Sequence, residues 1–303
     1  NPRRRPPAGG GLGSLRNATA DEWWTQIELP RLARAAGAEV IHHPLPARSQ
    51  ATRIPQVVTV HDLAFERLPE HFDRGFRRYA RLVHRNAARR AAAVICVSRA
   101  TAGSVTALWG VPERRIVVAL HGPGQELVAL ARRRPRHFLY VGDDEPRKNL
   151  GMLLEAYRRY RDATLQPLEL VLAGPAARAA IGAGVRGEPA PSAARLAELH
   201  AAAAALVHPA LDEGFGLTPL EAMRLGTPVI AASAPAVSET CGDAARYVAP
   251  DDSAGLAAVM GALALDPQAQ HELAERGRQR AAEFSWTRSA QRHLEAYSLA
   301  INR

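Results

Sequence analysis

Two adjacent cations stand between a strand-like run and a helix-like run. The segment "FLYVGDDEPRKNL" contains Arg147 and Lys148, and Lys148 is the only lysine among the 39 lysines and arginines of the chain. A helix N-terminus presents unpaired N–H groups and a partial positive charge, so it attracts anions. A fork-shaped guanidinium and a compact ammonium at that point suit a phosphate or diphosphate. The alternative is that both are solvated turn residues.

The loop in "HPALDEGFGLTPLEAM" is the second candidate for chemistry. Gly214 and Gly216 allow the backbone to approach a ligand closely and to direct N–H groups toward it. Glu213 and Glu221 lie on either side of a predicted helix start, where carboxylates can accept hydrogen bonds from sugar hydroxyls. The alternative for Glu221 is structural, because Thr218 and Glu221 have the spacing of a capping box.

A third loop follows the apolar run in "VVTVHDLAF" and contains His61. From the residues alone, a structural and a functional role for His61 are equally compatible with its place at a strand end. His208, before the second loop, is predicted to be structural. No Asp-x-Asp pair or His/Cys cluster with metal-ligand spacing is recognised, so we expect no metal.

Short β-rich runs alternate with helical patterns along the chain, which predicts βαβ units and parallel sheets with helices on both faces. Ligands of such sheets bind at the carboxyl ends of strands, where the three candidate loops lie. The Gly-, Pro- and Arg-rich first twenty residues are predicted to form a loop. The predicted strands are 38–43, 55–62, 92–98 and 114–120 in the first half, and 137–142, 168–174, 204–209, 228–233 and 245–250 in the second.

The net charge of +9 is unevenly distributed. Residues 1–136 hold 23 arginines against 10 acids, whereas residues 137–303 hold 16 basic residues against 20 acids. Halves of opposite sign predict two domains with different partners. The Arg- and Pro-rich run at 131–136 marks the predicted boundary.

The basic half is densest over residues 73–90, "DRGFRRYARLVHRNAARR". Helical spacing predicts an apolar stripe and a separate arginine stripe there. An ordinary solvated face is one interpretation, and contact with an anionic membrane or an acidic acceptor is the other. We expect no nucleic-acid partner, because no recognised binding motif accompanies the charge. The apolar stripe comprises Phe76, Tyr79, Val83 and Ala87, and the arginine stripe Arg74, Arg78, Arg81, Arg85 and Arg89.

The cysteines and the hydropathy pattern indicate a cytoplasmic protein. Cys96 and Cys241 lie in apolar surroundings and are predicted to be core residues of a reducing compartment. No apolar run approaches the roughly 18 residues of a membrane span, and the N-terminus lacks the apolar core of a signal peptide.

The combination of "EGFGLTPLEAMRLGTPVIAA" with "YVGDDEPRKNL" resembles the large family 4 of retaining glycosyltransferases. The resemblance is dense over 137–290 and looser over 27–122, where "VVTVHDLAF", "VICVSRAT" and "GVPERRIVV" agree in order and spacing. It implies the α/β GT-B fold, in which two Rossmann-like domains with parallel sheets face each other across a cleft.

The resemblance also implies how the chain is divided. An acceptor-side domain is expected over 1–130 and a nucleotide-sugar-binding domain over 131–284. The C-terminal helix, over 285–303, is expected to cross back to the first domain.

Roles for individual residues follow from the same resemblance. Arg147 and Lys148 match the basic pair that neutralises the donor diphosphate, and Glu213 matches an acid that contacts donor-sugar hydroxyls. Glu221 matches an acid that binds the ribose, and His61 matches a residue beside the donor sugar. The catalytic set is therefore His61, Arg147, Lys148 and Glu213, and the nucleotide-sugar-binding set adds Gly142, Gly214, Phe215, Gly216, Leu217, Thr218 and Glu221.

The activity implied is retaining transfer of a hexose from GDP-mannose or a UDP-hexose to a glycan, lipid-linked or small-molecule acceptor. The donor is a co-substrate, and no cofactor or metal is expected. A non-catalytic nucleotide-binding subunit of the same fold is the alternative. An NAD-dependent Rossmann enzyme ranks lower, because no Gly-rich turn is followed by a suitable acid.

Two departures from the family pattern support that alternative. Asp143 and Asp144 follow Gly142, where acids would repel a diphosphate unless they point away or pair with Arg147. The first domain also lacks its opening strands and glycine-rich loop, and 122–136 and 176–194 look abridged. We interpret the missing elements as parts of the protein outside this sequence, with a truncated or degenerate protein as the alternative.

Overall fold

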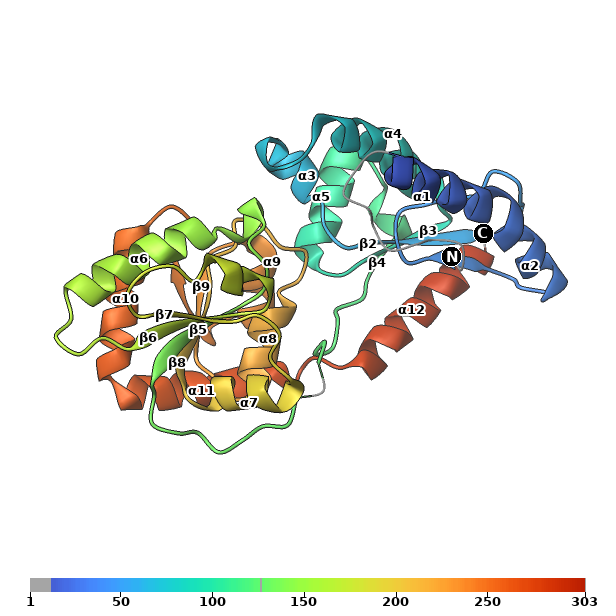
Figure 1. Ribbon diagram of the computed structural model, residues 1–303. Helices are drawn as coiled ribbons and strands as arrows, with labels where there is room; N and C mark the ends of the chain where they lie inside the picture. Colours follow the sequence, from blue (N-terminus) through green and yellow to red (C-terminus); the bar gives the residue numbers. More distant parts are fainter. Residues whose placement is uncertain (1–11, 126, 303) are drawn as a thin grey trace.

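The computed structural model describes residues 12–125 and 127–302 as two α/β domains, each built on a parallel sheet (Figure 1). The two-sheet α/β architecture predicted from alternating strands and helices is confirmed. Residues 1–11, where the predicted first domain begins, lie outside the described residues. Within the described part, no helix is both long and apolar enough to cross a membrane.

The first sheet contains four parallel strands in the order β1-β2-β3-β4. Each lies within a run predicted from its apolar residues, and the central strands β2 and β3 are buried throughout. The strands are β1 Ile41–His43, β2 Gln56–Val60, β3 Ala93–Cys96 and β4 Ile116–Val118. The helices that accompany them are α1 Leu12–Trp23, α2 Leu29–Ala35, α3 Ala64–Arg67, α4 Arg74–Arg90 and α5 Arg99–Trp109. The loop prediction for residues 12–20 was therefore wrong, because this segment is helical.

Helix α4 buries only part of the predicted apolar stripe: Ala87 is buried and Val83 is half-buried. Asp73 caps its N-terminus by accepting the backbone N–H of Phe76 at 2.9 Å. Ala80, Ala87 and Ala88 pack inward, whereas Phe76 and Tyr79 of the predicted apolar stripe remain 41% and 52% exposed. Small alanines allow close packing of the helix, so the larger side chains lie outside the contact face.

The second sheet contains six parallel strands in the order β10-β9-β8-β5-β6-β7. Five were predicted, and β7 was missed. Its sequence, VRGE, has one β-branched residue, and it lies half-buried at an edge, so no apolar run marks it. The strands are β5 His137–Val141, β6 Glu169–Ala173, β7 Val185–Glu188, β8 Ala203–His208, β9 Val229–Ala232 and β10 Ala245–Val248.

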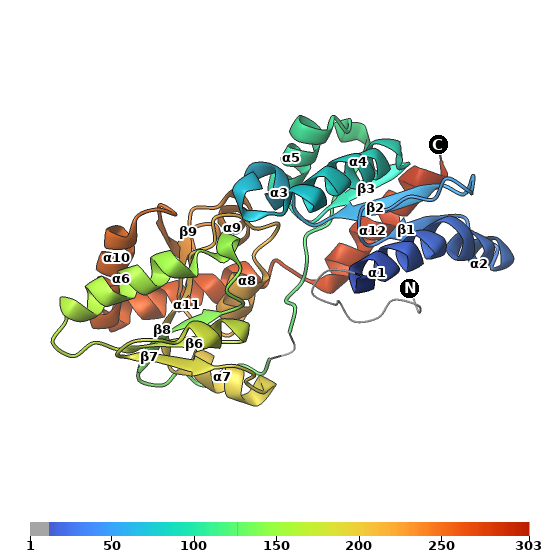
Figure 2. The same cartoon turned by 45° about the horizontal axis from the view of Figure 1, so that its top comes forward.

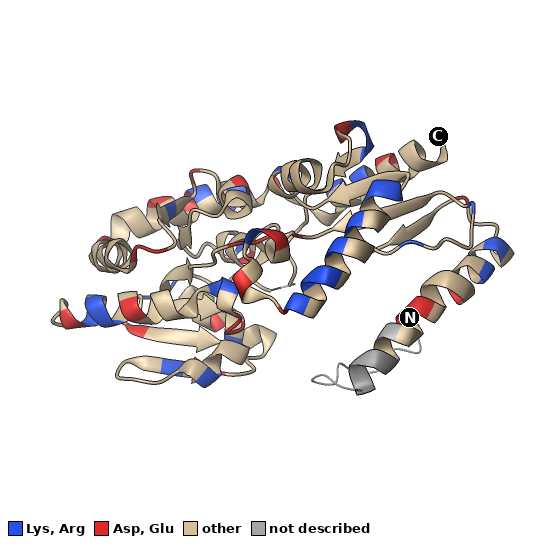
Figure 3. Ribbon diagram, turned by 90° about the horizontal axis from the view of Figure 1, so that it is seen from above, with Lys and Arg blue, Asp and Glu red and all other residues tan. Residues whose placement is uncertain are grey.

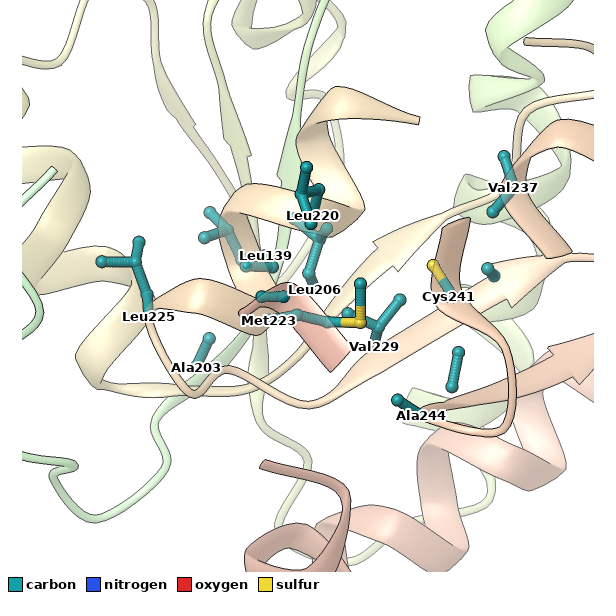
Figure 4. Packing of buried hydrophobic residues seen from close by; sticks show 14 of the residues in the cluster. Leu139, Ala203, Leu206, Leu220, Met223, Leu225, Val229, Val237, Cys241 and Ala244 are labelled. Atoms are coloured by element: carbon teal, nitrogen blue, oxygen red, sulfur yellow. The ribbon is translucent and has the colours of Figure 1, made fainter. Parts of the chain in front are cut away.

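Two apolar layers hold helices against the second sheet. One buried cluster joins Leu139 and Leu206 of the strands to Leu220 and Met223 of a covering helix (Figure 4). Cys241 belongs to this cluster, and Cys96 is buried in the first domain; both are free thiols, as predicted for core residues. The helices are α6 Leu150–Asp162, α7 Ala193–Ala201, α8 Leu217–Arg224, α9 Pro235–Cys241, α10 Ser253–Leu265 and α11 Pro267–Ala281.

The C-terminal helix, α12 Trp286–Ile301, leaves the second domain and packs on the first sheet (Figure 2). Its Ala296 and Ala300 join Val57 and Ile95 in one buried cluster. The indole N–H of Trp286 donates to the carbonyl of Pro123 at 2.7 Å. The chain thus crosses between the domains twice, and the two crossings touch.

Candidate active site

The second sheet reverses its strand order between β5 and β8, which are neighbours in the sheet but separated in sequence. In an open parallel sheet, ligands bind in the crevice beyond the carboxyl ends of the strands at such a point. The two loops that leave this point are the one after β5, with Arg147 and Lys148, and the one after β8, with Glu213 and Gly214. The fold therefore places the two strongest sequence motifs side by side.

A tight turn holds the basic pair at the end of β5. Residues Pro146–Lys148 form one 3₁₀ turn, closed by the Lys148 N–H donating to the carbonyl of Glu145 at 2.8 Å. Asn149 follows with φ 57°, the only positive φ among described non-glycine residues, and asparagine tolerates this conformation better than most. Its side-chain amide donates to the carbonyl of Pro250 at 2.7 Å, which fixes the turn to the loop after β10.

Both cations of the pair converge on Glu213. Lys148 Nζ lies 2.5 Å from Glu213 Oε1, and Arg147 Nη1 lies 3.5 Å from Oε2. Arg147 Nε also contacts Glu145 at 2.9 Å. The three central side chains are only 14–19% exposed, so the cluster is a half-enclosed ion network rather than a pair of solvated turn residues.

The network shifts the protonation of its members. Burial acts to raise the pKa of Glu213, but its interactions with His208, Lys148 and Arg147 outweigh burial, and the net pKa lies below the ordinary value. Burial also opposes the charge of Arg147, yet Glu213 and Glu145 raise its pKa overall. At neutral pH Glu213 is therefore anionic, and the two cations of the pair are balanced by the carboxylates of Glu213 and Glu145 that contact them.

The two aspartates that depart from the family pattern do not pair with the basic residues. The Asp143 carboxylate accepts the backbone N–H of Glu145 at 3.3 Å, and its carbonyl accepts the Tyr140 hydroxyl at 2.6 Å. Asp144 is exposed. Gly142, before them, has φ 154° and stands where its carbonyl accepts the N–H of Ala176 at 3.1 Å.

The glycine loop after β8 lies against the first domain. A Cβ on Gly214 would stand 1.8 Å from the carbonyl oxygen of His61, so only glycine fits there. The Gly214 carbonyl accepts the hydroxyl of Ser98 at 2.7 Å. Phe215 turns into the core, with its ring 5.3 Å from that of His121. The backbone, and not the phenyl ring, is thus the part of Phe215 that remains for a ligand.

Helix α8 does not begin with the capping box that the sequence suggested. Gly216, with φ 98°, is the N-cap, and no side chain caps the helix. Leu217 is its first residue and is 37% exposed, and Thr218 is half-buried. The structural alternative for Glu221 through Thr218 was therefore wrong.

Glu221 instead contacts the linker between the domains, the segment that joins the end of β4 to the start of β5. Burial raises its pKa, and hydrogen bonds from the backbone N–H groups of Gln125 and Gly124 partly oppose this rise. A Cβ on Gly124 would lie 2.8 Å from Glu221 Oε1, which shows how closely the linker approaches. The carboxylate is 7% exposed as a residue, so it points into the protein and toward that segment.

His61 directly follows β2 and is exposed, and its backbone carbonyl lies against Gly214 of the second domain. Its Nε2 is 2.9 Å from the carbonyl of Pro44, and its ring is 5.9 Å from that of His121. Asp62 is near enough to Arg147 to raise the pKa of that guanidinium. The structure therefore brings the loop after β2 to the basic pair and to Gly214, across the boundary between the domains.

Several contacts at this boundary were missed from the sequence. Arg67 of α3 holds Asp212 with Nε–Oδ2 at 3.1 Å and Nη2–Oδ1 at 2.5 Å. Glu239 of α9 accepts the first two N–H groups of α5, from Arg99 and Ala100, each at 3.0 Å. Partners 139–145 residues apart leave no pattern in one sequence, so no signal in this chain would have identified them.

Among the residues that the structure describes, no three His, Cys, Asp or Glu side chains come together in a way that could hold a metal ion.

The protein has two parallel-sheet domains. Basic and acidic side chains lie where the second sheet reverses its strand order, and they face the end of β2 in the first domain. This arrangement defines a GT-B type of protein. The family models agree with this geometry. The chain belongs to the glycosyl transferases group 1 family, whose model matches residues 128–280, and a Glycosyltransferase Family 4 model matches residues 4–123.

Curated relatives are similar over most of this chain. O-antigen chain mannosyltransferase B of Escherichia coli is 27% identical over 80% of this chain and 70% of its own length. MMP alpha-(1->4)-mannosyltransferase of Mycolicibacterium hassiacum is 32% identical over 73% of this chain and 57% of its own length. Glycogen synthase of Mycobacterium tuberculosis is 29% identical over 86% of this chain and 67% of its own length.

Solved structures confirm the GT-B fold. Sucrose-phosphate synthase from Thermosynechococcus elongatus superposes with a TM-score of 0.72 at 22% identity, covering 89% of this chain and 75% of that one. Anabaena HepE in complex with UDP-glucose superposes with a TM-score of 0.71 at 20% identity, covering 95% and 84%.

Proposed function

We propose that this protein is a retaining glycosyltransferase that moves a hexose from a nucleotide-diphosphate sugar to a hydroxyl of a glycan, lipid-linked or small-molecule acceptor. The observation that carries the proposal is the Arg147–Lys148–Glu213 network at the sheet-reversal point. A diphosphate brings more negative charge than one carboxylate, so it competes with Glu213 for both cations. Glu213 is then released to accept hydrogen bonds from hydroxyls of the donor sugar.

The reaction we propose is a same-face displacement. The bond between the anomeric carbon and the phosphate oxygen breaks, and the acceptor oxygen forms the new bond on the same face. The proton of the acceptor hydroxyl passes to the departing phosphate. Negative charge grows on that phosphate in the transition state, where preorganised cations stabilise it most. We propose that His61, which follows β2 and lies beside Gly214, aligns the sugar and the acceptor.

Arg147 and Lys148 supply the charge that a divalent cation supplies in other transferases, so we propose that transfer needs no metal and no further cofactor. Activity that survives excess EDTA would support this. Loss of activity with EDTA, restored by Mg²⁺ or Mn²⁺, would contradict it.

The nucleotide half of the donor has a second requirement. Under this proposal Glu221 binds the ribose hydroxyls, and in the structure that carboxylate faces Gly124 and Gln125 of the linker. The ribose must therefore replace the linker N–H groups as the partner of Glu221.

The donor is proposed to be GDP-mannose or a UDP-hexose. Relatives named mannosyltransferases favour mannose, and one of them is named for the O-antigen chain, which favours a role in polysaccharide biosynthesis.

Calorimetric titration with UDP, GDP and dTDP tests the proposal. One nucleotide should bind at micromolar concentration, and Lys148→Ala should weaken it by roughly 1.5–3 kcal/mol, the loss of a charge-assisted contact. Arg158→Ala, which removes an exposed cation paired with Glu155 on α6, is the matched control and should leave binding unchanged. Equal weakening in both variants would indicate general electrostatics rather than a site.

A non-catalytic subunit is the competing proposal, motivated by Asp143 and Asp144. Neither is paired with Arg147, which contacts Glu145 instead, so the two acids remain an objection to diphosphate binding. Nucleotide binding without release of sugar from any GDP- or UDP-hexose, across a panel of acceptors, would favour the subunit.

We also propose that α4 contacts anionic membrane. Phe76, Tyr79 and Leu82 are 41%, 52% and 74% exposed, and the arginines of α4 appear as blue bands along it in Figure 3. Exposed apolar side chains beside arginines fit a surface that offers both acyl chains and negative headgroups.

Vesicle sedimentation distinguishes this contact from a solvated face. Binding should require anionic lipid, weaken with salt, and fall in an Arg78→Glu/Arg85→Glu variant. The control is Arg158→Glu/Arg159→Glu on α6, with the same change of charge. Binding that is indifferent to lipid charge would contradict the proposal.

A further inference from the structure

His208, the last residue of β8, has a buried nitrogen without a partner. The residue is 4% exposed, and its Nε2 makes no hydrogen bond. An unsatisfied polar atom in a protein interior costs about 1–3 kcal/mol, so such groups are rare and call for a reason. A purely structural histidine, as predicted from the sequence, would be expected to satisfy this atom.

The unpartnered nitrogen is aimed at the donor-site carboxylate. His208 Nε2 lies 3.5 Å from Glu213 Oε1, beyond normal hydrogen-bond length for an N–H donor. Lys148 Nζ occupies the same oxygen at 2.5 Å. Glu213 Oε1 therefore accepts from Lys148. His208 Nε2 lies about half an ångström beyond normal hydrogen-bond length from the same oxygen.

Burial keeps His208 neutral. It lowers the pKa of the imidazole to about 4, and the charges of Lys148 and Arg147 act in the same direction, opposed by Glu213. At neutral pH the ring therefore has a single N–H, which it can place on Nε2. A neutral donor can hold a carboxylate without adding a third positive charge to the site.

We propose that His208 is a positioning residue that takes over Glu213 Oε1 when Lys148 moves to the donor diphosphate. This step rests on the proposed function, in which the diphosphate draws Lys148 away. Without a second donor, Glu213 would be left half-buried and free to rotate at the moment it must face the sugar hydroxyls. His208 then fixes the carboxylate for the sugar, whereas Lys148 fixes it in the free protein.

Substitutions at His208 test this role, because they should impair the reaction of the nucleotide sugar but not the binding of the free nucleotide. His208→Leu removes the donor and should lower kcat/KM for the nucleotide sugar by about 10–100-fold, the loss of one hydrogen bond to a charged group. Its affinity for the free nucleoside diphosphate should remain within about 2-fold of the wild type. His208→Gln places an amide N–H near the Nε2 position and should recover most of the loss.

His200→Leu is the matched control. His200 is also buried in the second domain, but it contacts Thr227 at the opposite edge of the sheet, where β8 and β9 begin. If His200→Leu and His208→Leu reduce kcat/KM equally, the effect is one of general stability and the proposal is overturned. Equal loss in His208→Gln and His208→Leu would also overturn it.

A measurement on the free protein keeps this inference separable from the proposed function. In a Lys148→Ala background, Glu213 has lost its usual donor, so His208 should already be in contact with it. His208→Leu should then lower the urea midpoint by more in Lys148→Ala than in the wild type. Equal shifts of the urea midpoint in the two backgrounds would refute the proposal that His208 replaces Lys148 as the donor to Glu213, whether or not the protein transfers sugar. Unequal shifts in a protein that transfers no sugar would refute the proposed function alone.

Discussion

Removal of the Arg67 side chain should separate the two domains. Arg67 belongs to the first domain and binds Asp212 of the second with three contacts of 2.5–3.1 Å. The Asp212 side chain is 5% exposed and that of Arg67 is 26% exposed. In Arg67→Ala, the carboxylate next to Glu213 would be buried at the boundary without a cation.

The free-energy cost of leaving Asp212 without its cation can be bounded. Breaking a buried ion pair by removing one partner costs about 3–5 kcal/mol. The partial exposure of Arg67 reduces this figure, and burial already raises the pKa of Asp212, so protonation offers a second way to lower the cost. About 2–3 kcal/mol remains, which corresponds to roughly 30–150-fold in an equilibrium. Asp212 can be rehydrated if the domains part, so the penalty should fall on closure rather than on folding of either domain.

Energy transfer between dyes on the two domains measures this directly. Cysteines introduced at the exposed positions Arg89 and Asp162 would carry the dyes, because Cys96 and Cys241 are buried and burial raises the pKa of each thiol to about 12. Arg67→Ala should lengthen the mean distance while the urea midpoint changes little.

Arg81→Ala is the control for the same experiment, since it removes an ion pair with Glu66 inside the first domain. It should not change the transfer efficiency. An Arg67→Ala protein with wild-type transfer efficiency would refute the view that this pair holds the domains together.

Three further perturbations are predicted from the structure. Gly214→Ala would place Cβ 1.8 Å from the His61 carbonyl and should also lengthen the distance between the dyes, whereas Gly103→Ala, which meets no atom within 4 Å, should not. Gly124→Ala displaces the Glu221 carboxylate from the linker and should tighten nucleotide binding several-fold by calorimetry; unchanged affinity would show that linker and ribose do not compete. Burial lowers the pKa of His137, His200 and His208 to about 4, 3 and 4. Because the unfolded chain alone binds these protons between about pH 6.5 and 4, these three histidines should lower the free energy of unfolding by about 4 kcal/mol from pH 7.5 to 5.5. His42 and His121, whose pKa burial also lowers to about 4, should lower it further. Equal urea midpoints at the two pH values would contradict this assignment.

Local sequence patterns were enough to locate most of the framework. Nine of the ten strands found in residues 12–125 and 127–302 lie in apolar runs bounded by turn residues, because a strand buried on both faces must be apolar at nearly every position. The missed strand, β7, is an edge strand with half-buried residues, and so it has no such requirement. The buried face of α4 was misjudged in part because spacing predicts a stripe but does not tell which side chains the neighbouring elements can accommodate.

The sequence predicted which types of side chain the loops provide, but not which of these side chains contact one another. Arg147, Lys148 and Glu213 were recognisable as residue types at strand ends, and the parallel order of β5 and β8 brings them within contact distance. Their mutual neutralisation in the free protein could not be predicted, since it depends on distances between two loops that lie 65 residues apart.

The sequence by itself determined which residues end every described strand except β7, and therefore which side chains reach the edge where ligands of a parallel sheet bind. The tertiary structure alone decided their partners: Asp212 with Arg67, Glu221 with the linker, and Glu213 between Lys148 and the unpartnered nitrogen of His208. The physical reason is the range of the interactions. Burial and backbone conformation are set by neighbours in sequence, whereas ion pairs and hydrogen bonds across a domain boundary depend on how two separately folded sheets meet.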